Sequence, residues 1–328
     1  MGLGSAVFLA SFGGLLFSGG TAAQEAAPAR TEQPGNRPGK SIIRVITYNV
    51  QFLPSVAGVV NARKDPVYRA KTLGTKLAAY DIVGLNEVFH DRYREILLGE
   101  LKGAWGNRYN AVVSPKPEDN RFNGGLAIVS RFPFLETHVL TYSVGSSPKQ
   151  YGVLADGFAA KGALHARLEC GGPVSKPYVV DVFVTHLESK DAQVRQVQYA
   201  ELARFIGTHG DPNYPALIMG DMNTRGNPRY MQDKGSAYHA MLSAYQQARP
   251  RTPLIDLWPH LNSGIGGTNE PESIETGNRI DYIFLSNPPK GRQFLRPISA
   301  RVNPFLDSRV ISLSDHSAVE AELEWKGH

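Results

Sequence analysis

Ala216-Leu217-Ile218-Met219-Gly220-Asp221-Met222-Asn223 decides the fold, because in this stretch a short apolar run leads directly into an acid and an amide. A run that is apolar throughout suits a strand covered on both faces. Asp221 and Asn223 stand two residues apart, so in an extended segment their side chains point to the same side. Such a pair can orient a water molecule and hold a phosphoryl oxygen, or it can close the strand in an Asx turn.

Four other β-branched or aliphatic runs also lead to a residue that can bind metal, hold phosphate or move a proton. The runs and the polar residues after them are 42–47 with Asn49, 82–85 with Glu87, 179–184 with His186, and 310–313 with Asp315 and His316. Each residue alone could simply end a strand. Their joint occurrence predicts a single site built at the ends of several strands.

The length allows one large domain or two ordinary ones, and the composition is that of an ordinary globular protein. The chain has 328 residues, of which 42% are hydrophobic and 20% charged, which is enough for a sizeable core. Apolar spacing predicts helices over 65–80, 93–101 and 191–206, the last stopped by Gly207. Further strands are expected at 109–113, 125–129, 134–140, 162–168, 179–185, 216–219, 279–285 and 319–323. Two packed sheets in one α/β domain are the economical interpretation.

The first forty residues differ from the rest. Residues 1–23 carry no charged side chain, contain apolar stretches and end in Thr21-Ala22-Ala23, which predicts a secretory signal peptide cleaved near Ala23. Residues 24–40 are rich in Pro, Ala, Gly and Glu, so we expect a disordered linker. The folded domain then spans 41–328, and the protein is expected to be secreted or periplasmic.

Cysteine content and charge narrow the function further. Cys170 is the only cysteine, so no intramolecular disulfide is possible, and a strand-end or hairpin position is expected for it. The formal net charge of +5 favours association with phosphates or anionic surfaces. The charge does not choose between nucleic acid and lipid.

Two histidines and three acids carry the remaining chemistry of the candidate set. Glu87 is a hard oxygen ligand of the kind that Mg²⁺ prefers. His186 can donate to charge developing on phosphorus or protonate a leaving group. His316 follows Asp315 directly, so in a strand the two would face apart, and His316 needs another carboxylate as its partner. Asp281 is the candidate, and an ion pair between Asp281 and Arg279 is the alternative.

Taken together, five motifs resemble those of the endonuclease/exonuclease/phosphatase superfamily, the fold of pancreatic-type deoxyribonucleases, and they occur in its order. The motifs are Tyr48-Asn49, Asn86-Glu87, Gly220-Asp221-Met222-Asn223, Arg279-Ile280-Asp281-Tyr282 and Ser314-Asp315-His316. The resemblance implies a four-layer sandwich of two packed mixed β-sheets flanked by helices. It also implies that the domain over 41–328 hydrolyses a phosphoester with the help of a divalent metal.

The resemblance also implies a role for each matching residue. Glu87 resembles the ligand of Mg²⁺ or another divalent cation such as Mn²⁺, with Asn49 beside it and Asp315 as an acid on the metal side. Asp221 resembles the residue that orients the attacking water. The phosphate contacts would be Asn49, Asn223 and His186. His316 resembles an acid/base histidine oriented by Asp281, and His186 a second catalytic histidine.

Four segments are most similar to the neutral sphingomyelinase branch, whose members are phospholipase C-like phosphodiesterases. They are Asn86-Glu87-Val88-Phe89, residues 124–133, Lys161-Gly162 and Thr185-His186-Leu187-Glu188-Ser189. This similarity implies a phospholipid head group as substrate. Membrane-attacking members expose an apolar hairpin, whereas the loop 262–277 is polar here apart from Ile265 and Ile274. At most peripheral membrane contact is therefore expected.

Two other functions stay open. A secreted non-specific nuclease would need a basic rim to reach phosphates, for which the candidates are Arg121, Lys149, Lys161, Lys190 and Arg225. A catalytically inactive phosphate-binding protein is the other possibility. The sequence gives no sign of an obligate protein partner.

Overall fold

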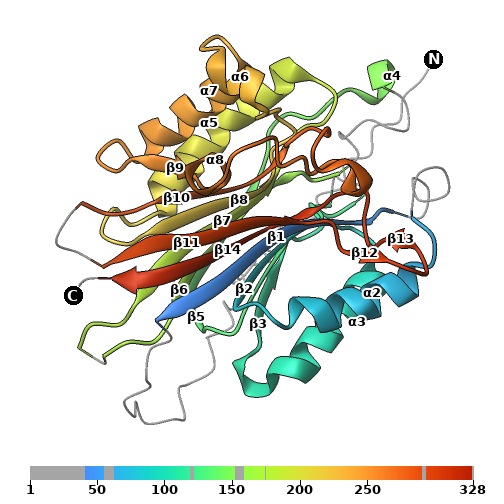
Figure 1. Cartoon of the computed structure of the whole chain (residues 1–328), viewed down its shortest axis with the longest axis horizontal. Helices are drawn as coiled ribbons and strands as arrows, with labels where there is room; N and C mark the ends of the chain where they lie inside the picture. Colours follow the sequence, from blue (N-terminus) through green and yellow to red (C-terminus); the bar gives the residue numbers. More distant parts are fainter. Residues whose placement is uncertain are drawn as a thin grey trace, which may run out of the picture. The chain divides into compact units, whose positions relative to one another are not determined.

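The structure is a computed structural model that describes residues 41–54, 63–118, 122–151, 159–173, 175–289 and 293–326. The expected signal peptide at 1–23 and linker at 24–40 lie outside the described residues, as does Arg121. The described part contains two six-stranded sheets packed face to face, with helices on the outer face of each (Figure 1).

Sheet 1 contains the strands from both ends of the described chain. Its order is β11-β14-β1-β2-β4-β3, with bounds β1 (Ile42–Phe52), β2 (Ile82–Val88), β3 (Asn110–Val113), β4 (Ala127–Ser130), β11 (Phe294–Asn303) and β14 (Ala318–Lys326). β1 and β2 are parallel, and every other neighbouring pair in this sheet is antiparallel. The parallel pair therefore brings the carboxyl ends of β1 and β2 to the same edge.

Sheet 2 also has six strands and one parallel pair in the described part of the chain. Its order is β5-β6-β7-β8-β10-β9, with bounds β5 (Phe134–Thr141), β6 (Gly162–Glu169), β7 (Val179–His186), β8 (Ala216–Asp221), β9 (Leu254–Asp256) and β10 (Asp281–Ser286). Only β7 and β8 are parallel among the described pairs of this sheet. A separate short hairpin joins β12 (Leu306–Asp307) to β13 (Ile311–Ser312).

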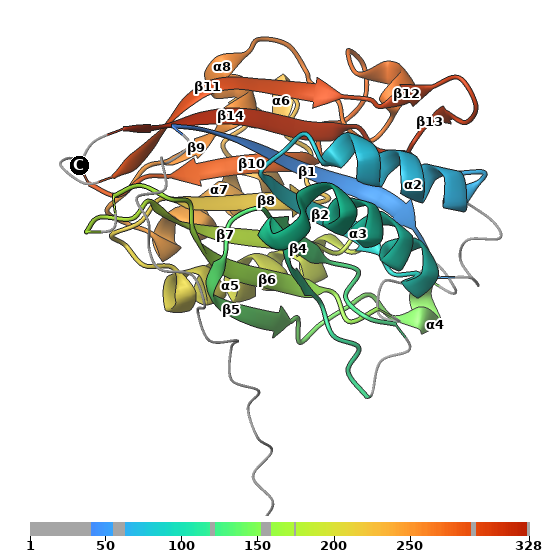
Figure 2. The same ribbon diagram turned by 90° about the horizontal axis from the view of Figure 1, so that it is seen from below.

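Helices complete the four layers. Helices α2 (Pro66–Leu77) and α3 (Asp91–Trp105) pack on the outer face of sheet 1, in front of its strands in Figure 2. Helices α5 (Ala192–His209) and α7 (Ala237–Ala248) pack on the outer face of sheet 2. The shorter helices are η1 (Gly106–Arg108), α4 (Pro148–Tyr151), α6 (Pro228–Gln232), α8 (Leu257–Leu261) and η4 (Pro271–Ser273). The predicted four-layer α/β sandwich is confirmed.

The two sheets meet in an apolar core, and side chains of sheet 2 come close to the backbone of sheet 1 at Gly84. A Cβ atom at Gly84 would lie 2.8 Å from both Met219 Cε and Val184 Cγ2, so a larger residue would push the sheets apart. Beside it, the Asn86 side-chain amide donates to the Thr185 carbonyl oxygen at 2.7 Å, which joins sheet 1 to sheet 2. The close approach places the ends of both parallel pairs opposite each other.

Two details of the sequence prediction were wrong. Gly207 does not stop α5, which continues to His209; a Cβ at Gly207 would lie 3.6 Å from the Ala248 carbonyl oxygen, so this glycine lies where α5 passes α7. The run 310–313 is not a strand like the others. Only Ile311–Ser312 pairs as a strand, the two-residue β13, and Ile311 is exposed with a positive φ of 71°. Asp315 and His316 lie between β13 and β14, just before β14.

The expected position of Cys170 is confirmed. It follows β6 directly and its backbone N–H donates to the Tyr178 carbonyl oxygen across the turn to β7. Burial raises the pKa of its thiol well above the usual range, which disfavours the thiolate. A nucleophilic role for Cys170 is therefore not supported.

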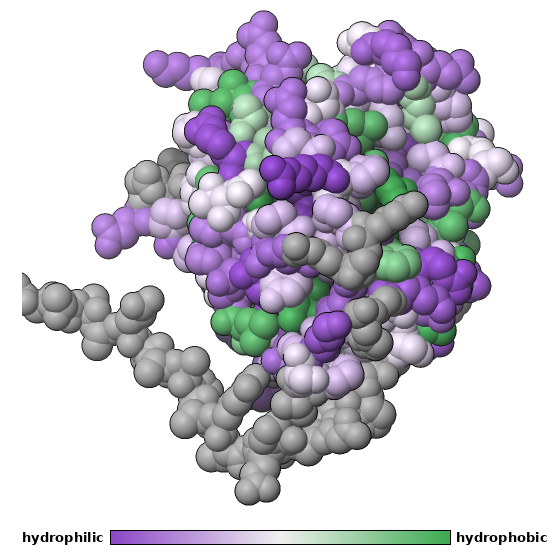
Figure 3. Space-filling model, turned by 90° about the vertical axis from the view of Figure 1, so that its left-hand side faces the viewer, coloured by the Kyte–Doolittle hydropathy of each residue, from purple (hydrophilic) through white to green (hydrophobic). Residues whose placement is uncertain are grey.

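The end of the molecule toward which β14 runs presents mainly hydrophilic residues, with hydrophobic ones in small separate groups (Figure 3). No helix within the described ranges combines the length and the apolar character needed to cross a membrane.

Candidate active site

Three polar side chains from sheet 2 are in register at one edge. His186 ends β7 opposite Asp221, and Asp221 ends β8 opposite Asp281, the first residue of β10. Residues two positions earlier or later on these strands, Val184, Met219 and Ile283, belong to the core between the sheets. Because side chains alternate along a strand, His186, Asp221 and Asp281 occupy the next positions on the same face. The candidate site is therefore a polar continuation of the inter-sheet core.

Sheet 1 contributes an amide and a carboxylate to the same place. Asn49 on β1 is in register with Asn86 on β2. Glu87 has a left-handed backbone with φ of 59°, which breaks the alternation and lets it reach the site as well as Asn86. The Asn49 amide nitrogen donates to Glu87 Oε1 at 3.0 Å and to Asp221 Oδ2 at 3.1 Å. Asn49 thus links the carboxylates of the two sheets.

Two histidines approach the Asp221 carboxylate. His186 Nε2 lies 3.4 Å from Asp221 Oδ2 and 3.9 Å from Glu87 Oε1. His316 Nε2 lies 3.8 Å from Asp221 Oδ2, while its Nδ1 is hydrogen-bonded to Asp281 Oδ2 at 2.8 Å. The structure therefore forms the His316–Asp281 pair that the sequence suggested.

The alternative partner for Asp281 is excluded. Arg279 is buried and pairs with Asp256, with 2.7 Å between Arg279 Nη1 and Asp256 Oδ2. The backbone N–H groups of Ile280 and Asp281 both donate to the Thr268 hydroxyl at 3.1 Å, which fixes the start of β10. Asp281 is thus held toward His316 from the loop 262–277.

Burial and mutual charge set the protonation of the site. Burial raises the pKa of Glu87 to about 7, the nearby Asp315 charge adds to the rise, and the Asn49 hydrogen bond opposes it. Burial also raises the pKa of Asp221, and the Asp281 charge contributes. Burial lowers the pKa of His316, but Asp281 and then Asp221 outweigh it and raise that pKa well above the usual range. The two carboxylates therefore favour the protonated form of His316.

The Asp221–Asn223 pair closes β8 with an Asx turn and also keeps one carboxylate oxygen directed into the candidate site. The backbone N–H of Asn223 donates to Asp221 Oδ1 at 2.9 Å, and Asn223 has a positive φ of 45°, so the segment is an Asx turn and not extended. The Asn223 side-chain amide donates to the Leu187 carbonyl oxygen at 2.9 Å. Because the turn uses Oδ1, Asp221 keeps Oδ2 directed at Asn49 and the histidines.

Asp315 lies at the side of this cluster. Its Oδ2 accepts from Gln51 Nε2 at 2.6 Å and its Oδ1 accepts from the Ser314 hydroxyl at 3.2 Å. It belongs to neither of the two groups of potential metal ligands around Asp221. Its negative charge acts on Glu87 from nearby.

Sequence reasoning missed the roles of two neighbours. Lys161 Nζ lies 3.2 Å from His186 Nε2 and donates to the Leu187 carbonyl oxygen at 2.8 Å, so it is a buried cation at the site and not part of an exposed basic rim. Gln51 holds Asp315. The Lys161-Gly162 pair at a strand start was a signal for Lys161, whereas Gln51 gave none.

The donors present suit a hard divalent cation. Glu87, His186 and Asp221 offer ligand atoms within 4.8 Å of one another, and Asp221, Asp281 and His316 form a second such group. The buried side-chain oxygen of Asn86 has no hydrogen-bond partner among the described residues, so it is a further oxygen available on this edge. Carboxylate and amide oxygens are the ligands that Mg²⁺ and Mn²⁺ prefer.

Comparison with known proteins agrees with this site and fold. The Endonuclease/Exonuclease/phosphatase family matches residues 46–316, which include every candidate residue named above. The chain therefore belongs to this family and is a metal-dependent phosphoric diester hydrolase.

Three relatives illustrate the similarity. Sphingomyelinase C of Bacillus cereus is 27% identical over 300 residues, covering 83% of this chain and 81% of that protein. The beta toxin of Staphylococcus aureus, in a mutant form with bound magnesium ions, superimposes with a TM-score of 0.60 at 18% identity, over 85% of this chain and 98% of that one. TDP2 of D. rerio, complexed with a single-strand DNA product, gives 0.60 at 18% identity, over 87% and 100%. The predicted superfamily and its sphingomyelinase-like branch are confirmed.

Proposed function

We propose that this protein is a secreted, magnesium-dependent phosphodiesterase that hydrolyses a phospholipid in the manner of a sphingomyelinase C. The observation that carries the proposal is the Asn49 amide, which lies between Glu87 of one sheet and Asp221 of the other, at 3.0 and 3.1 Å. The His316–Asp281 pair adjoins the same Asp221 carboxylate. Acid, base and metal donors thus converge on one point.

The metal role is proposed for Glu87, with Asn49 and Asp315 beside it. Glu87 retains 17% exposure of its side chain, so a cation can reach it from solvent. A bound divalent cation would polarise the phosphoryl oxygen and offset the charge that builds up on it. The charges of Asp315 and Asp221 favour that cation, because both raise the cost of an ionised Glu87 without one.

The proton-handling roles follow from the hydrogen bonds. Asp221 accepts from Asn49 and Asn223 and can hold a water molecule for in-line attack. Asp281 accepts from His316 Nδ1, and its charge favours a second proton on Nε2, which His316 can donate to the phosphoryl group or the leaving oxygen. His186 is the second catalytic histidine in this proposal, and its ring nitrogen lies beside the Lys161 ammonium group.

Phosphate binding is proposed for Asn49, Asn223 and His186. The Asn223 amide uses one N–H on Leu187, and its second N–H is available to an oxygen of the substrate. His186 ends β7, and Asn223 lies in the turn that follows β8, the adjacent parallel strand. Three neutral or cationic donors on one edge suit a dianionic transition state.

The substrate proposal rests on the relatives and on the loop 262–277. The sphingomyelinase C relatives match this chain over most of their length, up to 97% in one case. The loop adjoins the site, because the Ser317 backbone N–H donates to the Thr268 carbonyl oxygen and the Thr268 hydroxyl holds Asp281. Its polar sequence supports at most peripheral membrane contact, so dispersed phospholipid is the expected substrate.

Export is part of the proposal, with cleavage near Ala23 and a linker over 24–40. Mass spectrometry of the protein recovered from the culture medium or periplasm would identify the mature N-terminus. Recovery of the full-length chain only inside the cell would contradict export.

A three-substrate assay tests the function. We expect release of choline phosphate from sphingomyelin with Mg²⁺ and none with a chelator. Nicking of plasmid DNA without sphingomyelin hydrolysis would instead establish the nuclease alternative. Turnover of bis-p-nitrophenyl phosphate alone would support phosphodiester hydrolysis but refute the proposal of a lipid substrate. No turnover of any of them, with several divalent metals, would support an inactive phosphate-binding protein.

Substitution of His316 tests the site itself. His316→Ala should abolish turnover without loss of the fold, measured by circular dichroism. His260→Ala is a matched control, because His260 is an exposed histidine in α8 outside the site. Activity retained in His316→Ala would remove the role given to this residue.

A further inference from the structure

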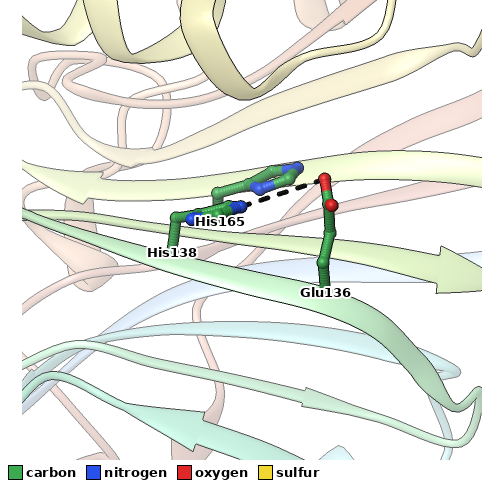
Figure 4. Close-up of side chains that lie close together, drawn as sticks. All are labelled: Glu136, His138 and His165. Atoms are coloured by element: carbon green, nitrogen blue, oxygen red, sulfur yellow. Dashed lines mark ion pairs between the residues drawn. The ribbon is translucent and has the colours of Figure 1, made fainter. Parts of the chain in front are cut away.

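A second group of potential metal ligands lies on sheet 2, away from the candidate active site. It consists of Glu136, His138 and His165, whose ligand atoms lie within 4.8 Å of one another (Figure 4). His138 on β5 is directly opposite His165 on β6, and Glu136 is two residues from His138 on the same strand. Directly opposite residues of an antiparallel pair have Cβ atoms about 4.5–5.5 Å apart. The strand register therefore brings these three side chains together on one face.

His165 has the properties of a preformed metal ligand. It is fully buried, and its Nε2 is hydrogen-bonded to Asp181 Oδ1 at 2.9 Å. Its Nδ1 is also buried and has no hydrogen-bond partner among the described residues. A carboxylate on Nε2 favours the tautomer that leaves the Nδ1 lone pair free, as in carboxylate–histidine–metal arrangements.

The other two ligands can adjust to an ion. The His138 and Glu136 side chains are 38% and 39% exposed, and 3.9 Å separates His138 Nε2 from Glu136 Oε1. A tetrahedral Zn²⁺ with bonds of about 2.0–2.2 Å places its donors roughly 3.3–3.6 Å apart. The His138 ring lies nearly parallel to the His165 ring, with 5.6 Å between ring centroids, so closing the site requires the His138 ring to turn until its Nε2 and His165 Nδ1 point to one ion.

Arg167 is the competing group. Its Nη1 lies 2.6 Å from Glu136 Oε1, and its Nε donates to Asp181 Oδ1 at 2.8 Å. A bound cation would replace Arg167 Nη1 as the partner of Glu136 Oε1. The Arg167 guanidinium would still donate to Asp181 and to the His209 carbonyl oxygen. The His209 ring also stacks on His138, with 3.9 Å between ring centroids, which limits the motion of His138.

We propose that Glu136, His138 and His165 bind a divalent transition-metal ion of the Zn²⁺ class. Two imidazoles and one carboxylate are a ligand set that Zn²⁺ accepts, with solvent in the fourth position. The ion would fasten β5, the edge strand of sheet 2, to β6, and through His165 and Asp181 to β7. Asp181 and His186 lie five residues apart on β7, about 16 Å along the strand, so this site stabilises the fold independently of the phosphodiesterase site.

Zn²⁺ titration of three variants tests the proposal. Isothermal titration calorimetry of Glu87→Gln, in which the phosphodiesterase site has lost its proposed metal ligand, should show Zn²⁺ bound and a rise in the unfolding temperature. His138→Gln should weaken Zn²⁺ binding by at least the roughly 10–100-fold that loss of an outer-shell partner costs. His260→Gln, the exposed control, should bind Zn²⁺ as the native protein does. Co²⁺ should give a visible absorption band that His138→Gln lacks.

The variant Glu87→Gln separates the two sites. We expect it to retain the Zn²⁺ that His138→Gln loses. Zn²⁺ binding lost in Glu87→Gln and kept in His138→Gln would assign the ion to the phosphodiesterase site and overturn the proposal, as would the absence of Zn²⁺ binding in the native protein. Circular dichroism of His138→Gln excludes unfolding as the cause of weaker binding.

Discussion

Replacing Asp281 by Asn tests how the site controls its proton donor. The native carboxylate accepts from His316 Nδ1 at 2.8 Å, and both residues are buried. A hydrogen bond to a charged group contributes about 1.5–3 kcal/mol. At about 1.36 kcal/mol per pKa unit, its loss should lower the pKa of His316 by about one to two units. A neutral amide can also favour the wrong imidazole tautomer.

Two readouts follow from this change. The pKa of His316 is raised in the native protein, so Asp281→Asn lowers the protonated fraction at neutral pH. We expect kcat to fall by about a hundred- to ten-thousandfold, the range for one positioned proton-transfer group. The alkaline limb of the kcat–pH profile should move to lower pH by one to two units, in steady-state assays of choline-phosphate release.

A matched control separates chemistry from folding. Asp81→Asn removes another buried carboxylate, one that accepts from the Arg44 backbone N–H at the start of β2. It should leave the pH profile in place. If Asp281→Asn folds normally and keeps both kcat and the alkaline limb of the native enzyme, the role of the His316–Asp281 pair is refuted.

Three further predictions concern the metal ligand, the glycines and the thiol. Since burial raises the pKa of Glu87 to about 7, protons should compete with the cation for this carboxylate. The Mg²⁺ concentration for half-maximal activity should therefore rise as the pH falls through 7. Glu87→Gln should require more Mg²⁺ at every pH, and an unchanged requirement would remove Glu87 from the metal site. Gly220→Ala places a Cβ 2.0 Å from the Thr185 carbonyl oxygen at φ of 135°, so it should destabilise the fold by more than the about 1–3 kcal/mol of backbone strain alone. Gly99→Ala, in the open interior of α3, should stabilise the fold by about 0.5–1 kcal/mol, and urea unfolding that reversed this order would contradict the packing at Gly220. Cys170 should react with a thiol reagent only after denaturation, and rapid labelling of the native protein would show an accessible thiolate.

The sequence predicted that most residues of the candidate site would lie together, because these polar residues occupy positions at strand ends. Asn49, Glu87, His186 and Asp221 each follow an apolar run, and parallel strands bring such ends to one edge. The partner of His316 was also predicted: the adjacent Asp315 would face away from it in a strand, and Asp281 was the candidate acid elsewhere in the chain. Proximity at the scale of 3–4 Å could not be predicted, because it depends on the packing of one sheet against the other.

Other features depended on pairings that local patterns do not reveal. β11 (Phe294–Asn303) was not predicted, because it is an edge strand with Pro297 at a break in register and an irregular burial pattern. α7 was missed although its signal was present: Ser236 caps it, and Tyr238, Met241 and Tyr245 are buried at helical spacing. The ligand group on β5 and β6 could not be predicted from the sequence, because the register of these two strands creates it.

The pairing of β1 with β14 has a consequence for biosynthesis. β1 is the first described strand and β14 the last, and they are hydrogen-bonded neighbours in the middle of sheet 1. His316 lies two residues before β14, whereas Asn49 is on β1, so His316 joins the other site residues only when β14 pairs with β1. Such distant pairings are slow to form. The nascent polypeptide should therefore be unable to attack phosphodiesters on the ribosome, and catalytic competence should arise only in a late step of folding.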